Sequence, residues 1–375
     1  MKKISKITIK PVPLLILKIV GVILCILLGL FIFYNKQISD ITKFGYSKEA
    51  SHNILFNKQK DYILSVGKNK TLNAAFESKD INYDNLDSYR KINYVDHEHL
   101  IRNINKLLKV GYSTNDINII LKHGDDSAVE RFSKRDKVKY LEEFFSIEYA
   151  KLDNYDRYVK YEDETGEDEE TTVLFVNLDM DKGDYTDAIE VKKFSLDMLV
   201  NKHRYLGEDF EPNDLMKIPS DYASDDDLKA SRLAFNAFKK MSDAAKKEGY
   251  EIVINSAYRS YQDQVDISEL YLNTYGQSYV DKFVAKPGFS EHQTGLAFDV
   301  GSRKANVFAS SKEYEWMKEN AYKYGFIERF QKKYETVTGF RAEPWHYRYV
   351  GEKIAKYIHE NNATLEEYWA IYLDK

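Results

Sequence analysis

The chain has 375 residues, and at about 150 residues per domain this length predicts two or three folded units. Apolar residues make up 43% of the chain and charged residues 31%, which is enough for a packed core and excludes global disorder. With 55 basic and 60 acidic residues the net charge is −5, so no nucleic-acid partner is expected. The single cysteine, Cys25, excludes an intramolecular disulfide and zinc thiolate sites.

The first predicted element is a transmembrane anchor at residues 12–34, which are apolar apart from Lys18. A span needs about 20 residues. A cluster of lysines precedes this run, and no lysine cluster of equal density follows it. We therefore expect residues 1–11 to be a cytoplasmic tail and the rest of the chain after the anchor to be extracellular. A cleaved signal peptide is the alternative, but no small-x-small site closes the run, and Leu24 before Cys25 departs from a lipoprotein signal.

The region between the anchor and residue 194 is expected to have two parts. Residues 35–90 are polar and weakly periodic, which is typical of a stalk or a loosely structured segment. Residues 91–194 are expected to be a mainly helical extracellular region. The apolar spacing predicts one helix that ends at Gly111 and another that Ser113 or Thr114 caps. The GYSxxDIxxIL spacing indicates stacked helical hairpins, which act as an interaction or spacer element.

An acidic run lies between Lys160 and Thr172. These charges would repel one another if packed, so we expect a solvated loop. A calcium site is the alternative, but the spacing fits no twelve-residue calcium loop. The segment TTVLFVNLD that follows alternates and is rich in β-branched residues, which predicts a strand.

Residues 195–375 are predicted to form an α+β domain with a mostly antiparallel sheet and flanking helices, because strands and helices mix without regular βαβ alternation. The segments EIVINSAYRS and LAFDVG are its clearest strands. Its clearest helix is expected to begin at Asp225–Asp227. Capping residues predict three further helices, which begin at Ser260, Ser310 and Thr364.

Three stretches in the C-terminal domain contain the polar groups of a water-activating metal site. They are SAYRSYQDQ at 256–264, PGFSEHQTGLAFDVG at 287–301 and EPWHYRYVG at 343–351. Catalytic zinc usually takes three nitrogen or oxygen ligands and keeps a fourth position for water, and His292, Asp299 and His346 would supply that set. Asp299 follows apolar residues on a strand, where an unpaired carboxylate would be costly and a metal would remove the cost.

Two further residues suit a peptidase mechanism. Pro344 biases Glu343 towards an extended conformation, so a short EPWH turn can place this carboxylate beside the metal as a general base. Arg259 offers a rigid fork for a substrate carboxylate. The hydrogen-bonding candidates for substrate are Ser256, Ser260, Gln264 and Ser290.

These stretches resemble the VanY-type D-alanyl-D-alanine carboxypeptidases of the LAS metallopeptidase superfamily. The family's SxHxxGxAxD pattern is present from Ser290 to Asp299, and its SGYRS segment is present as SAYRS. Its ExxWHxRYVG pattern is present as EPWHYRYVG, one residue shorter before Trp345. The resemblance covers roughly residues 195–360 and does not extend to residues 36–190.

The resemblance implies a LAS-type zinc peptidase fold for residues 195–375 and one zinc ion per chain. It implies that His292, Asp299 and His346 are the zinc ligands and that Glu343 is the catalytic base. Arg259 would bind the terminal carboxylate of the substrate or stabilise its scissile carbonyl.

The implied function is that of a membrane-anchored carboxypeptidase that removes the terminal D-Ala from peptidoglycan stem peptides outside the cell. Two alternatives keep the chemistry, an L,D-carboxypeptidase acting on tetrapeptides and an endopeptidase acting on cross-links. A third is a non-catalytic wall-binding module that keeps zinc for structure, against which the intact Glu343 and Arg259 argue.

Overall fold

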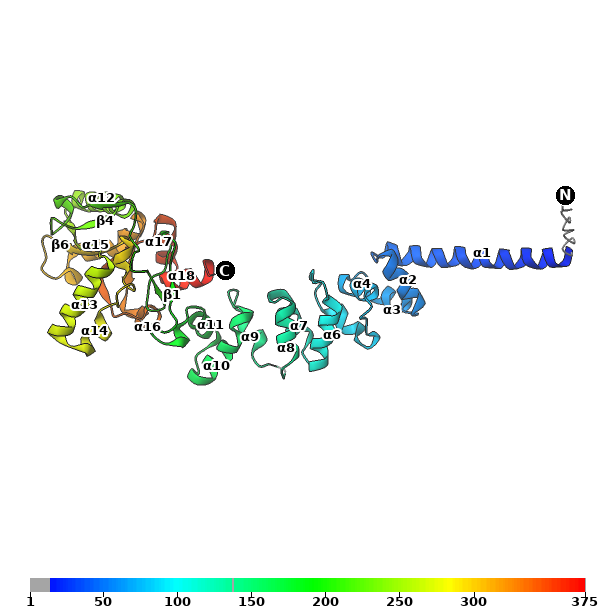
Figure 1. The fold of residues 1–375 in the computed structure, drawn as a ribbon. Helices are drawn as coiled ribbons and strands as arrows, with labels where there is room; N and C mark the ends of the chain where they lie inside the picture. The colour runs from blue at the N-terminus through cyan, green and yellow to red at the C-terminus, as the bar shows by residue number, and fades with distance from the viewer. Residues whose placement is uncertain (1–13, 137, 375) are drawn as a thin grey trace, which may run out of the picture. The chain divides into compact units, whose positions relative to one another are not determined.

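The computed structural model describes residues 14–136 and 138–374, which divide into two compact units after Glu142 (Figure 1). Helix α1, Leu14–Lys43, is long and apolar enough to cross a membrane, as the sequence predicts. Its apolar side chains from Leu14 to Tyr34 are exposed. A signal sequence has the same character. The predicted cytoplasmic tail, 1–11, and the first two residues of the predicted span lie outside the described residues.

The rest of the first unit is built from short helices. They are α2 (Lys48–Phe56), α3 (Lys60–Val66), α4 (Lys70–Glu77), α5 (Leu86–Lys91), α6 (Leu100–Val110), α7 (Thr114–His123) and α8 (Asp126–Ser133), with α9 (Leu141–Phe144) at the boundary. Gly111 ends α6 with a left-handed conformation, and Ser113 caps α7, both as predicted.

Short helices occupy most of residues 48–91, although the sequence predicts a stalk or a loosely structured segment there. Ser47 and Asn69 accept hydrogen bonds from the first turns of α2 and α4, and Ile54 and Leu72 are fully buried. Each helix has at most nine residues, too few for a clear apolar period. Helices this short gain their stability from packing against one another.

The second unit begins with two helices, α10 (Tyr155–Thr165) and α11 (Glu169–Asn177). Only residues 166–168 of the acidic run form a loop, because the run also ends α10 and begins α11. Asp168 caps α11 by accepting from the Thr171 N–H, and acidic side chains in a first turn favour a helix. The strand predicted for TTVLFVNLD is wrong. Residues 172–177 are all buried, and a helix buried on every side lacks the apolar stripe that distinguishes it from a strand.

The four-stranded sheet of the second unit confirms the predicted antiparallel α+β fold. Its order is β5 (Ile252–Ser256), β6 (Ala297–Ser302), β8 (Glu343–Tyr349) and β7 (Phe326–Phe330). All neighbours are antiparallel, and Asp299 lies opposite His346. The EPWH segment is the start of β8 rather than a turn. Two small sheets pair β1 (Ile189–Glu190) with β2 (Arg204–Tyr205) and β3 (Leu215–Lys217) with β4 (Lys229–Ser231).

Helices flank the sheet. They are α12 (Arg232–Lys247), α13 (Tyr261–Tyr275), α14 (Gln277–Phe283), α15 (Lys312–Asn320), α16 (Glu335–Thr338), α17 (Glu352–Glu360) and α18 (Leu365–Tyr372). The predicted capping boxes at Ser260 and Thr364 are confirmed. The helix expected at Asp225–Asp227 begins at Arg232, because residues 229–231 pair as β4. The cap expected at Ser310 is Ser311, which accepts from the Tyr314 N–H.

Alternation along the strands gives the sheet two different faces. Phe298 and Tyr347 point into the apolar core with Phe238 of α12, whose ring meets that of Phe298 edge to face at 5.7 Å. Successive side chains of a strand point to opposite faces. The neighbours Asp299 and His346 therefore share the other face.

Candidate active site

The predicted zinc ligands come together on one face of the sheet. Asp299 of β6 and His346 of β8 are direct partners in the ladder, and His292 comes from the short 3₁₀ turn Glu291–Thr294 just before β6. One donor atom from each of the three lies within 4.8 Å of the others. Gly295 ends the turn in a left-handed conformation, φ +66°, which suits glycine and lets the chain enter the strand.

Hydrogen bonds fix which imidazole nitrogens face Asp299. The Nδ1 of His292 lies 2.7 Å from the Ala257 carbonyl, which can only accept, so this nitrogen carries a proton and Nε2 faces Asp299 at 3.4 Å. The Nε2 of His346 donates to Glu291 Oε2 at 3.2 Å, and Nδ1 lies 3.2 Å from Asp299. Such partners of the far nitrogen are typical of metal-binding histidines.

The donor set fits a divalent metal such as zinc. Asp299 Oδ1 is buried and has no hydrogen-bond partner among the described residues, although His346 Nδ1 is near. Burial lowers the pKa of His346, but Asp299 and Glu291 outweigh this and raise it to about 9. The carboxylates therefore favour positive charge at this point. Two nitrogens and one carboxylate, with no thiolate, match catalytic zinc sites.

Glu343 and Arg259 lie beside this cluster. Glu343 begins β8, and its Oε2 is 3.7 Å from His346 Nδ1. Burial raises the pKa of Glu343. Burial also lowers the pKa of Arg259, against the opposing effect of Asp299 and Glu343. The Arg259 Nε is buried without a hydrogen-bond partner in the described part of the chain. A buried guanidinium with a free donor suits the binding of an anionic group.

A cavity of about 460 Å³ holds most of the predicted site residues. Its lining includes Arg259, Gln264, Ser290, His292, Asp299, Glu343 and His346. The Gln264 side chain donates to the Ala285 carbonyl at 2.8 Å, and its Oε1 is buried without a partner among the described residues. Ser256 and Ser260 do not line the cavity. Ser260 instead uses its hydroxyl to cap α13 with Asp263, so its proposed substrate contact lacks support.

Glu291 is a functional candidate that the sequence analysis missed. Its carboxylate bonds Arg329 Nε at 2.8 Å and Arg348 at 3.2 Å as well as His346. Burial raises the pKa of Glu291, but the two arginines outweigh it and hold it well below its usual range. Arg329 also bonds Glu366 of α18. The sequence contains a signal for this role, because the acidic Glu291 lies directly before the candidate ligand His292.

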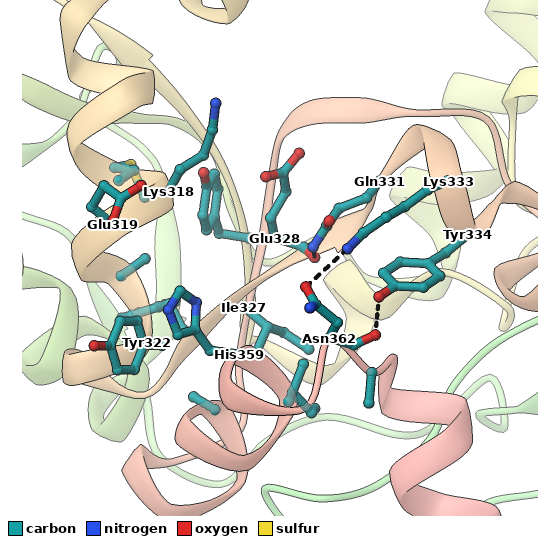
Figure 2. A pocket seen from close by; sticks show the side chains of 17 residues that line it. Lys318, Glu319, Tyr322, Ile327, Glu328, Gln331, Lys333, Tyr334, His359 and Asn362 are labelled. Atoms are coloured by element: carbon teal, nitrogen blue, oxygen red, sulfur yellow. Dashed lines mark hydrogen bonds between the residues drawn. The ribbon is translucent and has the colours of Figure 1, made fainter.

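A second cavity of about 230 Å³ shares no lining residue with the first (Figure 2). Lys333 donates to the Asn362 side chain at 3.1 Å, and the His359 ring stacks on Tyr322 at 3.8 Å. No predicted site residue lies in this lining. The chemistry is therefore assigned to the larger cavity.

A family model and several known proteins match part of the chain. The model of the VanY family, D-alanyl-D-alanine carboxypeptidase, matches residues 227–352, which include the metal cluster, Glu343 and Arg259. One relative is YodJ of Bacillus subtilis, which is provisionally named as a carboxypeptidase. It is 44% identical over 179 residues, which cover 46% of this chain and 66% of YodJ. A solved structure of the LdcB LD-carboxypeptidase is 45% identical, covers 46% of this chain and 84% of that one, and has a TM-score of 0.43.

A shorter relative is matched almost throughout. The bifunctional D-Ala-D-Ala dipeptidase and carboxypeptidase VanXYC of Enterococcus gallinarum is 34% identical over 177 residues, which cover 45% of this chain and 91% of VanXYC. Other curated relatives are matched over less of their length. The chain spans 66% of YodJ and 50% and 45% of D-alanyl-D-alanine carboxypeptidases from Enterococcus faecalis and Enterococcus faecium. Because the family model matches residues 227–352 and VanXYC is 34% identical over 91% of its own length, the chain belongs to the VanY family of D-alanyl-D-alanine carboxypeptidases.

Proposed function

We propose that this chain is a membrane-anchored, zinc-dependent D-alanyl-D-alanine carboxypeptidase that removes the terminal D-Ala from peptidoglycan stem peptides. The observation that carries the proposal is the cluster of His292, Asp299 and His346, whose donor atoms lie within 4.8 Å of one another. Glu343 and Arg259 line the same cavity. Membership of the VanY family supports the same reaction.

The three clustered residues would hold one zinc ion. When bound, zinc polarises a carbonyl group and makes water a better nucleophile near neutral pH. Glu343 takes the proton of the attacking water and passes it to the leaving amine, which is the work of a general base and then a general acid. Glu291 holds the proton on the outer nitrogen of His346, so the inner nitrogen keeps its lone pair for the metal.

Arg259 would select substrates with a free C-terminus. Its guanidinium lies near Asp299 and Glu343, and its Nε has no partner in the described residues. A terminal carboxylate would supply that partner through a charge-assisted hydrogen bond. An internal peptide bond of a cross-link offers no such group at this position, so the arginine favours carboxypeptidase over endopeptidase action.

The test is mass spectrometry of the purified full chain in detergent, incubated with pentapeptide and tetrapeptide stems. We expect loss of one alanine from the pentapeptide, no hydrolysis with a chelator, and recovery when zinc is added back. Metal analysis should find one zinc ion per chain. Cleavage of the tetrapeptide alone would assign L,D-carboxypeptidase activity, and cleavage of cross-linked dimers would assign endopeptidase activity. Zinc binding without any hydrolysis would assign a non-catalytic wall-binding module.

We also propose that α1 anchors the catalytic unit outside the cell. The helix is apolar and exposed, and the lysines before it favour a cytoplasmic N-terminus. A protease added to wall-stripped cells should digest the chain after residue 35 and spare its first ten residues. Protection of the catalytic unit in wall-stripped cells would contradict this topology.

A further inference from the structure

Helices α13 and α14 carry a cluster of neighbouring aromatic rings, in which the Tyr271 ring lies 5.8 Å from both Tyr275 and Tyr279. Gly276, at φ +82°, turns the chain between the two helices. The ring centroids of Tyr271 and Tyr275 are 5.8 Å apart, those of Tyr275 and Tyr279 4.7 Å, and those of Tyr279 and Phe283 4.8 Å. Adjacent rings are tilted by only 27° to 38°. We call these four residues the aromatic ladder.

Three members of the aromatic ladder line the active-site cavity, and the fourth lies beside them outside its lining. Tyr271, Tyr279 and Phe283 line the cavity, whereas Tyr275 does not. Tyr275 is 59% exposed and Phe283 is 48% exposed. In Figure 1 α13 and α14 lie on the opposite side of the catalytic unit from α12, which covers the core face of the sheet. Exposed aromatic surface that continues a ligand cavity is typical of a binding site.

We propose that the aromatic ladder binds the glycan strand to which the stem peptide is attached. This inference rests on the proposed function. A sugar ring has an apolar face of C–H groups with partial positive charge, and the face of an aromatic ring is negative, so the two surfaces attract. The three tyrosine hydroxyls can also bond sugar hydroxyls.

The length of the substrate agrees with this location. A stem of five residues spans at most about 17 Å when fully extended. With its C-terminal bond at His346 and Glu343, its sugar-linked end therefore lies within about 17 Å of these residues. Three rings of the ladder line the same cavity as these residues.

The charge around the ladder favours a glycan over a membrane surface. Residues 261–283 contain four acidic residues, Asp263, Asp266, Glu269 and Asp281, and a single lysine. An anionic lipid surface attracts clusters of Lys and Arg and repels a net negative segment. The sugar rings themselves carry no charge, so the acidic residues do not oppose stacking.

The first test measures co-sedimentation of the full chain, in detergent, with insoluble poly-N-acetylglucosamine, a glycan that lacks the free carboxylates of stem-free muramic acid. Tyr275→Ala should weaken binding about 2- to 10-fold, the range expected for loss of one stacked ring. Tyr275→Phe should retain it, because the ring face remains. Tyr94→Ala is the matched control, since Tyr94 is 45% exposed in the other unit. Equal loss in Tyr94→Ala, or in Tyr275→Phe, would overturn the proposal.

The second test compares KM for a free pentapeptide with KM for the same peptide attached to the disaccharide. Wild type should prefer the disaccharide-linked form, and Tyr275→Ala should reduce that preference by the same factor as its loss of glycan binding. An unchanged ratio of the two KM values would overturn the proposal, as would a change in particle size without a change in glycan binding, which would indicate self-association. If wild type binds glycan but cleaves neither peptide, the proposed function fails while the glycan site stands.

Discussion

The short helices of the first unit, here called the helical region, and the sheet of the second unit both bury polar side chains. The hydrogen-bond partners of these side chains lie at very different distances along the chain. Thr71 donates to the Ile92 carbonyl, 21 residues away, and Asn103 donates to Asp126, 23 residues away. In the catalytic unit Glu291 bonds Arg329 and Arg348, 38 and 57 residues away.

The difference indicates that contacts between residues close in sequence build the helical region, whereas contacts between distant residues build the catalytic unit. The segments GYSKEASHNIL at 45–55 and GYSTNDINIIL at 111–121 each place a serine cap before a helix, so one local pattern occurs twice among the short helices. In such an array each unit mainly contacts its neighbours, and damage stays local. The metal cluster requires strands β6 and β8 in register, so distant changes in the catalytic unit should reach it.

The largest expected effect is that of His346→Ala, which removes one ligand from the cluster. We expect zinc content and hydrolysis to be lost together, because two remaining ligands hold a catalytic metal poorly. Metal analysis and mass spectrometry of the products measure both. His359→Ala, an exposed histidine of the second cavity, should retain both. Full zinc content in His346→Ala would remove this residue from the ligand set.

Glu343→Gln should separate chemistry from metal binding. Glutamine keeps the shape of the side chain but does not accept a proton at neutral pH, so kcat should fall about 100- to 10,000-fold. Zinc content should be nearly the same as in wild type, since the three ligands remain. Loss of zinc in this variant would make Glu343 a ligand rather than the base.

Glu366→Ala tests whether a remote substitution reaches the metal. Glu366 is fully buried and bonds Arg329, which holds Glu291 behind His346. Removing one partner of a buried ion pair costs about 3–5 kcal/mol of unfolding free energy. Zinc affinity should also fall about 10-fold, as expected when a residue that supports a metal ligand through hydrogen bonds is replaced.

The matched control for Glu366→Ala is Glu360→Ala. Glu360 is exposed and pairs with Lys356 at 3.7 Å, so its loss should change stability by less than about 1 kcal/mol. Equal destabilisation of the two variants, measured by chemical denaturation, would mean that the buried network does not hold the site together.

Arg259→Ala probes the proposed contact between Arg259 and the terminal carboxylate of the substrate. KM for a peptide with a free terminal carboxylate should rise about 10- to 100-fold, the value of a charge-assisted hydrogen bond. KM for the amidated peptide should change little. Equal loss on both peptides would place Arg259 at the scissile carbonyl and would favour endopeptidase action.

The sequence predicts the catalytic region better than the helical one. Short motifs that can be recognised in a single sequence contain the three ligand candidates, Glu343 and Arg259. The structure places all five residues in one cavity. The sequence does not predict the helices at 48–91, because none is long enough to show a period. The sequence of α11 predicts a strand, because burial on every side hides the helical stripe.

Contacts across the sheet could not be predicted in the same way. Glu291 has three partners, His346, Arg329 and Arg348, that meet only when β7 and β8 pair. The sequence contains each residue but not their register. Ser260 was assigned to substrate, although its capping bond with Asp263 was also predicted, and the structure supports the cap.

The smallest expected effect is that of Thr71→Val in the helical region. Thr71 is buried, and its hydroxyl donates to the Ile92 carbonyl at 2.7 Å, so valine keeps the shape and removes one hydrogen bond. The cost is about 1 kcal/mol. Hydrogen exchange should quicken in α4 and α5 and stay unchanged in β6, with zinc content and hydrolysis as in wild type. Ser65→Ala, an exposed site in α3, is the control. Faster exchange in β6 would show that the helical region supports the catalytic sheet, and the contrast between local and long-range construction would then be wrong.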